Sequence, residues 1–281
     1  MLSPELVRVL ACPACSRALH ATPSRLVCPN GHCFDLARQG YVHLGTGTSM
    51  PRADTPAMVA ARARFLGAGH FRPLAERIIE LVAPSTDREM RVLEVGAGPA
   101  YFLSQVVSAV PGAIGIAVDA SRYAARRAAR AHPRIGSIVA DGLARLPLRA
   151  GALSAAVSVL APRNARELQR VLAPGAPCVV VTPTQRHLRE LRGRLSLLQI
   201  ERGKAGRLIR SFAPWFTLEA WAGVELRLQL GHEGVSDLVA MGPNAFHPSA
   251  QRSDALRAVG AQEVTASFVV WQFRRRALTT G

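Results

Sequence analysis

The 281-residue chain has almost no lysine: Lys204 is the single lysine among its 35 basic residues, and the others are arginine. Acidic residues are also few, 19 in all, so the formal net charge is +16. GC-rich coding explains the scarcity of lysine, but it does not explain the shortage of acidic residues. A sequence pI near 11.3 therefore indicates a polyanionic partner, and nucleic acid is the polyanion that we expect.

Long apolar runs are missing as well. No stretch reaches the roughly 18 apolar residues that a membrane-spanning helix needs. The first residues, MLSPELVRVLACPAC, place Glu5 and Arg8 where a secretion signal has its apolar segment, which argues against such a signal. We therefore expect a cytoplasmic protein with no membrane partner. Because 49% of the residues are hydrophobic and only 19% are charged, the chain is expected to fold rather than to remain disordered.

Cysteine is scarce beyond residue 33, where Cys178 stands alone. The other four cysteines lie within the first 33 residues. In a reducing compartment, clustered cysteines are more often metal ligands than disulfide partners. This asymmetry predicts a separate zinc-binding module over residues 1–45.

The spacing of that cluster is Cys12-x2-Cys15-x12-Cys28-x3-His32. Two such knuckles present three thiolates and one imidazole, which complete the tetrahedral coordination of a structural zinc ion. Cys33 is the alternative fourth ligand, but adjacent side chains point in different directions and we prefer His32. A module this small has little core, so the zinc is expected to supply much of its stability.

Two further segments follow the module. Residues 46–70 are expected to form a linker, rich in Gly, Pro, Ser and Thr, and a helix. Residues 71–281 are expected to form one large domain. From residue 91 onward, short apolar runs alternate with helical patterns. The runs are 91–95, 113–119, 135–141, 152–160 and 176–183, and helices are expected over 121–132, 163–172 and 184–198.

Continuous apolar strands that alternate with helices predict a parallel sheet covered on both faces, which is an α/β fold. Residues 224–230 and 264–273 alternate more between polar and apolar side chains, so we expect edge or antiparallel strands there.

Glycines and carboxylates follow the first three of these strands. The stretch VLEVGAGPAYF (92–102) places Gly96 and Gly98 directly after the first strand. Asp119 ends the second strand and Asp141 the third, where they are expected to bind a ribose and an adenine. Helix capping is the alternative role for both aspartates. Together these residues predict a site for an adenosine cofactor.

The neighbours of the loop narrow the choice of cofactor. Tyr101 stands where a dinucleotide-binding loop would have its third glycine, and no G-x-x-x-x-G-K-[ST] motif occurs. Glu94 would repel a pyrophosphate, but it suits a ligand with an ammonium group. S-adenosyl-L-methionine has that group, an adenosine and no phosphate. We therefore favour a methyltransferase over a dehydrogenase or an NTPase.

The joint pattern resembles the bacterial 23S rRNA (guanine-N1)-methyltransferases, including the macrolide-resistance members. The resemblance covers nearly the whole chain. It is carried by CPAC…CPNGHCFDLARQGYVHL (12–44), ARARFLGAGHFRPL (61–74), VLEVGAGPAYF (92–102), LAPRNARELQRVLAPGA (160–176) and TPTQRHLREL (182–191). A zinc module ahead of a methyltransferase core is an uncommon combination, so the match is specific.

The resemblance implies a Rossmann-like class I methyltransferase domain with a seven-stranded, mostly parallel sheet. It also implies a zinc module that helps to recognise 23S rRNA, and a homodimer. By position, the cofactor contacts of the family fall on Phe71, Gly98, Pro99 and His187. Phe71 replaces a tyrosine of other members. Ala97 stands where some relatives have cysteine, and Ala100 where relatives often have glycine.

The activity that the resemblance implies is methylation of N1 of a guanine in hairpin 35 of 23S rRNA. Position 748 is favoured over the neighbouring 745, with macrolide resistance as the outcome. A small-molecule methyltransferase and a zinc-dependent RNA-binding adaptor with a vestigial cofactor pocket are the alternatives. Arg163 and Asn164 follow the fourth strand and are candidates for contact with the base, with capping as the alternative. We assign no catalytic base.

One arginine-rich segment is a candidate surface for RNA phosphates, with a solvated helix face as the alternative. It contains Arg186, Arg189, Arg192, Arg194, Arg202, Lys204, Arg207 and Arg210. Trp215, Phe216 and Trp221 follow it. Their spacing suits a helix, so we expect them in the core rather than stacked on bases.

Overall fold

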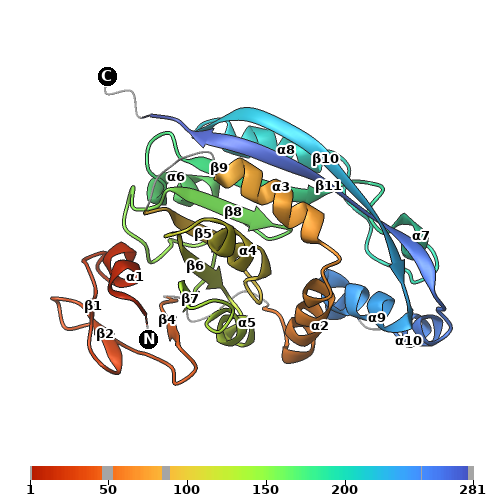
Figure 1. Ribbon diagram of the computed structural model, residues 1–281, viewed down its shortest axis with the longest axis horizontal. Coiled ribbons are helices and arrows are strands. Elements are labelled where there is room, and N and C mark those ends of the chain that lie inside the picture. Colours follow the sequence, from red (N-terminus) through yellow and green to blue (C-terminus); the bar gives the residue numbers. More distant parts are fainter. Residues whose placement is uncertain (1, 46–52, 84–88, 248, 278–281) are drawn as a thin grey trace.

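The computed structural model describes residues 2–45, 53–83, 89–247 and 249–277 (Figure 1). Most of the expected linker, residues 46–52, lies outside the described residues. The described part of the chain forms one large eight-stranded sheet and one small three-stranded sheet. No helix in these ranges is both long enough and apolar enough to cross a bilayer.

The large sheet has the strand order β10-β11-β9-β8-β5-β6-β7-β4. Its parallel centre matches the apolar runs of the sequence closely. The central strands are β5 (Arg91–Val95), β6 (Ile114–Asp119), β7 (Ile135–Val139), β8 (Ala155–Val159) and β9 (Pro177–Pro183). With β10 (Phe216–Leu230) and β11 (Gln262–Arg275) they give the seven strands expected of a Rossmann-like methyltransferase domain, which confirms the predicted fold class.

The eighth strand comes from the N-terminal module. That module contains α1 (Pro4–Val9) and a small antiparallel sheet of β1 (His20–Ala21), β2 (Arg25–Val27) and β3 (Cys33–Asp35). The chain then leaves the small sheet, and strand β4 (Tyr41–His43) pairs in parallel with β7, with Val42 opposite Ile138. The module is therefore joined to the large sheet by backbone hydrogen bonds as well as by side-chain packing.

Helices cover both faces of the large sheet. Neighbouring side chains on a strand point to opposite faces, so each apolar strand contributes side chains to both layers. Val92 of β5 packs on the face that carries α2 (Pro56–Gly67), α3 (Arg72–Val82), α4 (Tyr101–Ala109) and α5 (Arg122–Ala128). Leu93 packs on the opposite face, with α6 (Ala165–Val171), α8 (Lys204–Phe212) and the N-terminal module. These two layers make the core and fix the strand ends that carry the site.

The last two strands form a long antiparallel ribbon, as their more polar pattern predicts. Strand β10 pairs with β11 along its whole length, and β11 pairs antiparallel with β9. The far end of the ribbon extends away from the N-terminal module (Figure 1). The chain between the two strands forms α9 (His232–Ala240), the 3-10 helix η1 (Pro243–Phe246) and α10 (Ala250–Arg257).

Two expectations for the last third of the chain are wrong. The helix expected over 184–198 is only the four-residue α7 (Arg189–Arg192). Leu188 has φ +57° and Ser196 φ +47°, and a left-handed residue cannot continue a right-handed helix. Trp221 lies on strand β10 rather than on a helix and is 65% exposed, so it is not a core residue. Phe216 is buried as expected.

Candidate functional site

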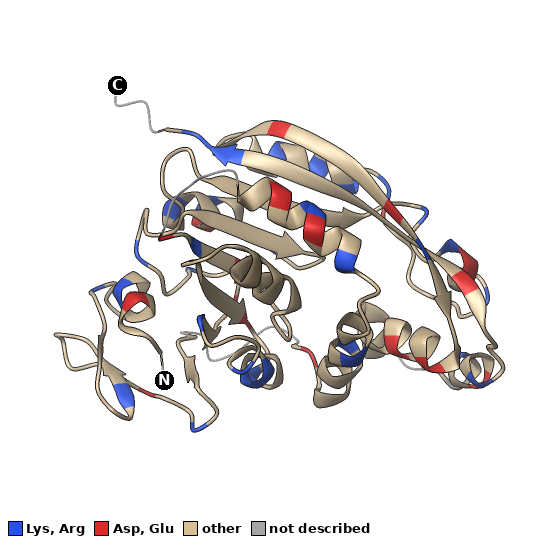
Figure 2. Ribbon diagram, in the orientation of Figure 1, with Lys and Arg blue, Asp and Glu red and all other residues tan. Residues whose placement is uncertain are grey.

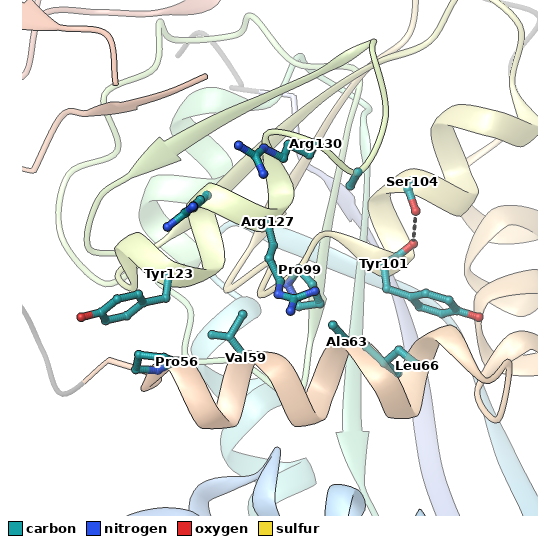
Figure 3. A pocket seen from close by; sticks show the side chains of 12 residues that line it. Pro56, Val59, Ala63, Leu66, Pro99, Tyr101, Ser104, Tyr123, Arg127 and Arg130 are labelled. Carbon is teal, nitrogen blue, oxygen red and sulfur yellow. Dashed lines mark hydrogen bonds between the residues drawn. The ribbon is translucent and has the colours of Figure 1, made fainter. Parts of the chain in front are cut away.

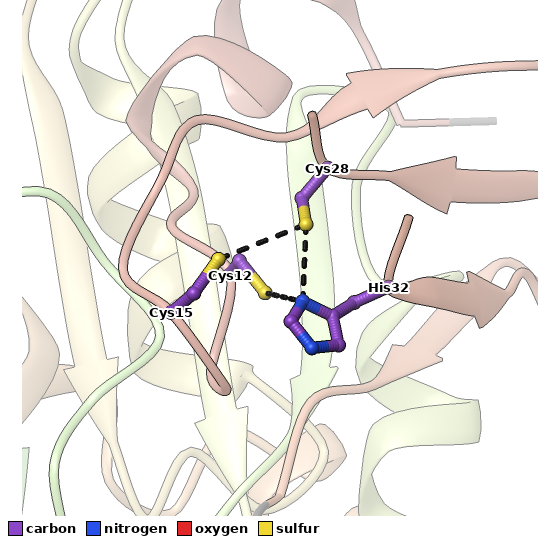
Figure 4. A group of neighbouring side chains, drawn as sticks. All are labelled: Cys12, Cys15, Cys28 and His32. Atoms are coloured by element: carbon purple, nitrogen blue, oxygen red, sulfur yellow. Dashed lines mark hydrogen bonds between the residues drawn. The ribbon is translucent and has the colours of Figure 1, made fainter. Parts of the chain in front are cut away.

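The four predicted zinc ligands lie together in the N-terminal module (Figure 4). All four ligand atoms lie within 4.8 Å of one another. Cys15 Sγ is 3.7 Å from Cys28 Sγ, and His32 Nδ1 is 3.2 Å from Cys28 Sγ and 3.6 Å from Cys12 Sγ. Cys33 is exposed and its thiol donates to the carbonyl of Gly31 at 3.4 Å, so the structure groups His32 with the cysteines.

These distances fit a bound zinc ion. Thiolate and imidazole ligands that share a tetrahedral zinc lie about 3.5–3.8 Å apart, given metal–ligand bonds of about 2.0–2.3 Å. Cys12 and Cys28 are buried, whereas Cys15 is half-buried and His32 is exposed. Burial opposes ionisation of Cys28, but hydrogen bonds led by that with His32 outweigh it and lower the pKa of this thiol to about 6. The donor set is closed, which suits a structural role.

The glycine loop follows β5 and turns sharply into α4. Gly96 and Gly98 have φ +68° and +54°, and Ala100 also lies in the left-handed region, at φ +59°. A Cβ atom on Gly96 would lie 2.3 Å from Cβ of Ala161. Glycine is therefore required at position 96, both for its backbone conformation and for the close approach of the loop that follows β8.

We expect Gly96→Ala to destabilise the fold by about 2–4 kcal/mol, from left-handed strain and steric overlap together. Urea denaturation measures the change. Gly69→Ala is the matched control, because Gly69 has φ +81° but no atom within 4 Å of an added Cβ. The second substitution Ala161→Gly should restore part of the loss. If it restores nothing, the overlap with Ala161 is not the cause.

Glu94 lies in the middle of the sheet, beneath the loop. Its side chain is 1% exposed, and the backbone N–H of Leu103 in α4 donates to its Oε2 at 3.0 Å. Burial, reinforced by the negative charge of Asp119, raises the pKa of Glu94 to about 8. A cation bound beside Glu94 would stabilise the ionised form of this carboxyl group.

Asp119 ties the end of β6 to the loop. The backbone N–H of Gly98 donates to Asp119 Oδ2, and that of Ser121 donates to Oδ1, both at 2.8 Å. Burial raises the pKa of Asp119 although these hydrogen bonds oppose the change. The hydroxyl of Ser121, not Asp119, caps helix α5, so helix capping does not explain Asp119.

Asp141 follows β7, and no helix follows it directly. Its Oδ1 accepts a hydrogen bond from the backbone N–H of Leu143 at 2.8 Å, which shapes a turn. In the parallel sheet the ends of β5, β6 and β7 are adjacent. Asp141 therefore lies at the same edge of the sheet as Asp119 and the loop.

Phe71 and His187 belong to an aromatic cluster. Phe71 is 1% exposed and meets the ring of Phe268 edge-on at 5.2 Å, and the ring of His187 lies 4.8 Å from Phe268. Burial, and after it the charge of Arg192, lowers the pKa of His187 to about 4, so the ring is neutral at pH 7. Hydrogen bonds of the described residues link Asp119 to the loop, but they do not link Phe71 or His187 to it.

Two charged residues of the site were not predicted from the sequence. Asp54, which precedes α2, forms an ion pair with Arg62 within that helix, and the Arg62 guanidinium lies against Gly98. The hydroxyl of Ser121 donates to the backbone carbonyl of Asp54 at 2.7 Å, which joins the pair to the end of β6. Arg62 is a charged residue on a helix with a largely apolar sequence, but nothing in its spacing connects it to the glycine loop.

A cavity of about 690 Å³ opens beside the glycine loop, between α2, α5 and the first turn of α4 (Figure 3). Of the predicted cofactor-binding residues, only Pro99 lines it. Tyr101 and Tyr123 contribute aromatic rings, and Arg126, Arg127 and Arg130 contribute guanidinium groups. Within the described residues, no side-chain hydrogen bond or ion pair engages these three arginines. The cavity therefore offers positive charge next to the site.

Intramolecular contacts partly neutralise the predicted RNA-binding segment. Ion pairs join Arg186 to Glu225, Arg189 to Glu190 and Arg207 to Glu201. In the described ranges, the side chains of Arg202 and Arg210 show no such partner. Figure 2 shows basic residues on both α5 and α8, so positive charge reaches both faces of the sheet.

The loop after β8 uses Asn164 for structure. Its Oδ1 accepts from the backbone N–H groups of Arg166 and Glu167, and its side-chain amide donates to the carbonyl of Leu143. Asn164 therefore caps α6, and contact with a base is not its role in this structure. Burial lowers the pKa of Arg163, and its Nη1 is buried without a hydrogen bond to the described residues.

Similarity to known proteins extends over nearly the whole chain. A family model described as "RlmA, N-terminal", a zinc ribbon, matches residues 10–45. The chain is 41% identical to a Micromonospora griseorubida protein named "Putative 23S rRNA (guanine-N(1)-)-methyltransferase", over 99% of this chain and 100% of that protein. It is 42% identical to the "23S rRNA (guanine(748)-N(1))-methyltransferase" of Streptomyces fradiae, over 94% of this chain and 95% of that one.

Among solved structures, the fold resembles a chain of the "Complex between the Haloferax volcanii Trm112 methyltransferase activator and the putative methyltransferase". The TM-score is 0.52, with 15% identity over 81% of this chain and 100% of that one. This likeness concerns the fold alone. The full-length relatives, the zinc-ribbon match and the strand-end carboxylates together show that the chain belongs to the 23S rRNA (guanine-N1)-methyltransferase family.

Proposed function

We propose that this enzyme transfers a methyl group from S-adenosyl-L-methionine to N1 of guanine 748 in hairpin 35 of 23S rRNA. The observation that carries the proposal is the 42% identity, over nearly the whole of both chains, to a relative whose name specifies guanine 748. The neighbouring guanine 745 is the alternative target. We also propose macrolide resistance as the outcome, a homodimer as the active form and the cytoplasm as its compartment.

The residues at the carboxyl ends of β5 and β6 support S-adenosyl-L-methionine as the donor. Asp119 offers a carboxylate for the ribose hydroxyls, and Asp141 lies one strand further along for the adenine. Glu94 offers a buried carboxyl group for the ammonium of the methionine part, and the glycine loop lets a ligand approach the backbone closely. When bound, this cofactor supplies an electrophilic methyl group on a sulfonium.

The residues after β8 suit the target base. Leu160 is 43% exposed with φ +54°, and Ala161 next to it packs under Gly96. A residue held in the left-handed region stores backbone strain, and such residues cluster at functional sites. We propose that Leu160 contacts the face of a guanine extruded from the RNA, because a base within a duplex cannot enter such a site. Positioning of N1 in line with the methyl group would then supply much of the catalysis.

Primer extension tests the proposal. Zinc-loaded protein, S-adenosyl-L-methionine and a 23S rRNA transcript that contains hairpin 35 are incubated together. Because an N1-methyl group blocks Watson–Crick pairing, reverse transcriptase should stop at guanine 748, and Asp119→Ala protein should give no stop. A stop at 745 would refute the position. Tight RNA binding with no methyl transfer would instead favour the adaptor, and transfer to small acceptors only would favour a small-molecule methyltransferase.

A further inference from the structure

Arg62 reaches from helix α2 to the glycine loop and also contacts two other segments of the chain. Its Nη1 contacts the carboxylate of Asp54, and its Nη2 donates to the backbone carbonyl of Met241, beyond α9. A Cβ on Gly98 would lie 3.0 Å from Nη1 and 3.2 Å from Cδ of Arg62. The side chain of Arg62 is 24% exposed and that of Asp54 is 17% exposed. The guanidinium thus lies directly on the glycine loop.

The surroundings of this guanidinium are strongly acidic. Burial raises the pKa of both Glu94 and Asp119, and the positive charge of Arg62 acts in the opposite direction on each of them. Asp54, Glu94 and Asp119 therefore share one nearby cation within the described residues. Three carboxyl groups and one guanidinium make a site that can serve both ends of a zwitterion, with the acids facing an ammonium and the guanidinium facing a carboxylate.

The proposed methyl donor carries such a zwitterion. Its methionine part has an ammonium group and a carboxylate on one carbon atom. A site that offered only acidic groups would attract the ammonium but repel the carboxylate. We propose that Arg62 binds the α-carboxylate of the methyl donor, with Asp54 as the positioning residue that orients the guanidinium. The inference rests on the proposed cofactor and adds a residue that decides whether the amino-acid part of the donor is recognised.

The hydrogen-bonding capacity of Arg62 allows this role. A guanidinium has five N–H donors in one plane, and the contacts with Asp54 and Met241 leave some of them free for a ligand. The competing explanation is that Arg62 only fastens α2 to the loop and to the segment after α9. Arg64, on the same helix, already fastens α2 to α9. Its Nε and Nη2 donate to the two carboxylate oxygens of Asp237, at 2.9 and 2.6 Å.

A pair of ligands that differ by one carboxylate separates the two explanations. Decarboxylated S-adenosylmethionine keeps the ammonium, the sulfonium and the adenosine. Titration calorimetry would measure its affinity and that of S-adenosyl-L-methionine for the zinc-loaded wild type and for Arg62→Met. We expect the substitution to lower the affinity for S-adenosyl-L-methionine about tenfold to a hundredfold, as for a lost charge-assisted hydrogen bond. The affinity for the decarboxylated ligand should change about twofold at most.

Equal losses for both ligands would overturn the role of Arg62 and leave the cofactor assignment intact. A folded wild-type protein that binds neither ligand would overturn the cofactor assignment and the role of Arg62 with it. Arg64→Met is the control on the same helix, and any effect it has should be the same for both ligands. If Arg62→Met does not fold, Arg62→Lys replaces it: lysine keeps the charge but loses the planar donor fork, so a smaller loss, again confined to S-adenosyl-L-methionine, is expected.

Discussion

Replacement of Cys12 by serine is expected to release zinc and to unfold the N-terminal module. The strands β1–β3 of this module are only two or three residues long, and Leu26 is the one buried residue on them. Structural zinc contributes roughly 10–16 kcal/mol to the folding of comparable small domains. Without it, the entropy of ordering the module is expected to exceed its hydrophobic stabilisation.

Metal analysis and hydrogen exchange measure the two parts of this prediction. The substituted protein should contain no zinc, and amides of residues 2–45 should exchange quickly, including Val42 at the edge of the large sheet. Amides of β5 and β6 in the centre of the sheet should stay protected. Cys33→Ser is the control, because Cys33 lies outside the ligand group, and it should keep its zinc. A normal zinc content in Cys12→Ser would refute the ligand assignment.

The same substitution tests the role of the module in RNA binding. We expect Cys12→Ser to weaken binding to a transcript of hairpin 35 and to leave the affinity for S-adenosyl-L-methionine unchanged, since the predicted cofactor residues, and Asp54 and Arg62 as well, all lie beyond residue 45. Unchanged RNA affinity in a protein that has lost zinc would mean that the module stabilises the edge of the sheet but does not contact the target.

The parallel centre of the fold was predictable because its strands are continuous apolar runs, the first three of which end at a glycine or an aspartate. The run 91–95 is strand β5 with the same boundaries. Residues 184–198 show the limit of such patterns. The helical spacing there is real, but the backbone N–H of Leu188 donates to the carbonyl of Thr265, and Glu190 accepts hydrogen bonds from Thr265 as well. These contacts to β11 override the local preference for a helix.

The candidate site also has residues that the sequence predicts and residues that it does not. Gly96, Gly98 and Asp119 were found because the strand ends of a parallel sheet meet at one edge, so residues far apart in sequence are predicted to be close. Arg62 and Asp54 were missed because they reach the loop from a helix that precedes the sheet. Their position depends on how α2 packs against α9 through Arg64 and Asp237. No periodicity in the sequence predicts that packing.

The substitution Glu94→Gln is expected to make the ligand-free protein more stable at high pH and to weaken cofactor binding. The pKa of Glu94 is raised from an ordinary value of 4.5 to about 8, so the folded state binds this proton more tightly than the unfolded state does. The stability that the neutral carboxyl group contributes is fully present below about pH 4.5 and is lost as the pH rises towards 8. The loss is on the order of a few kcal/mol. Glutamine stays neutral, and its side-chain oxygen can still accept from Leu103.

Urea denaturation at pH 5, 7 and 8.5 measures this difference. The two proteins should be about equally stable at pH 5, and Glu94→Gln should be increasingly the more stable as the pH rises. Calorimetry should show that the wild type binds S-adenosyl-L-methionine more tightly than Glu94→Gln does. The affinity of the wild type should rise from pH 6 to 8, and binding should release protons, because the ammonium requires an ionised partner. The variant should bind weakly and without this pH dependence. Stability curves that stay parallel from pH 5 to 8.5 would show that Glu94 ionises normally in the folded chain. The acidic residues around Glu94 would then not favour the binding of a cation.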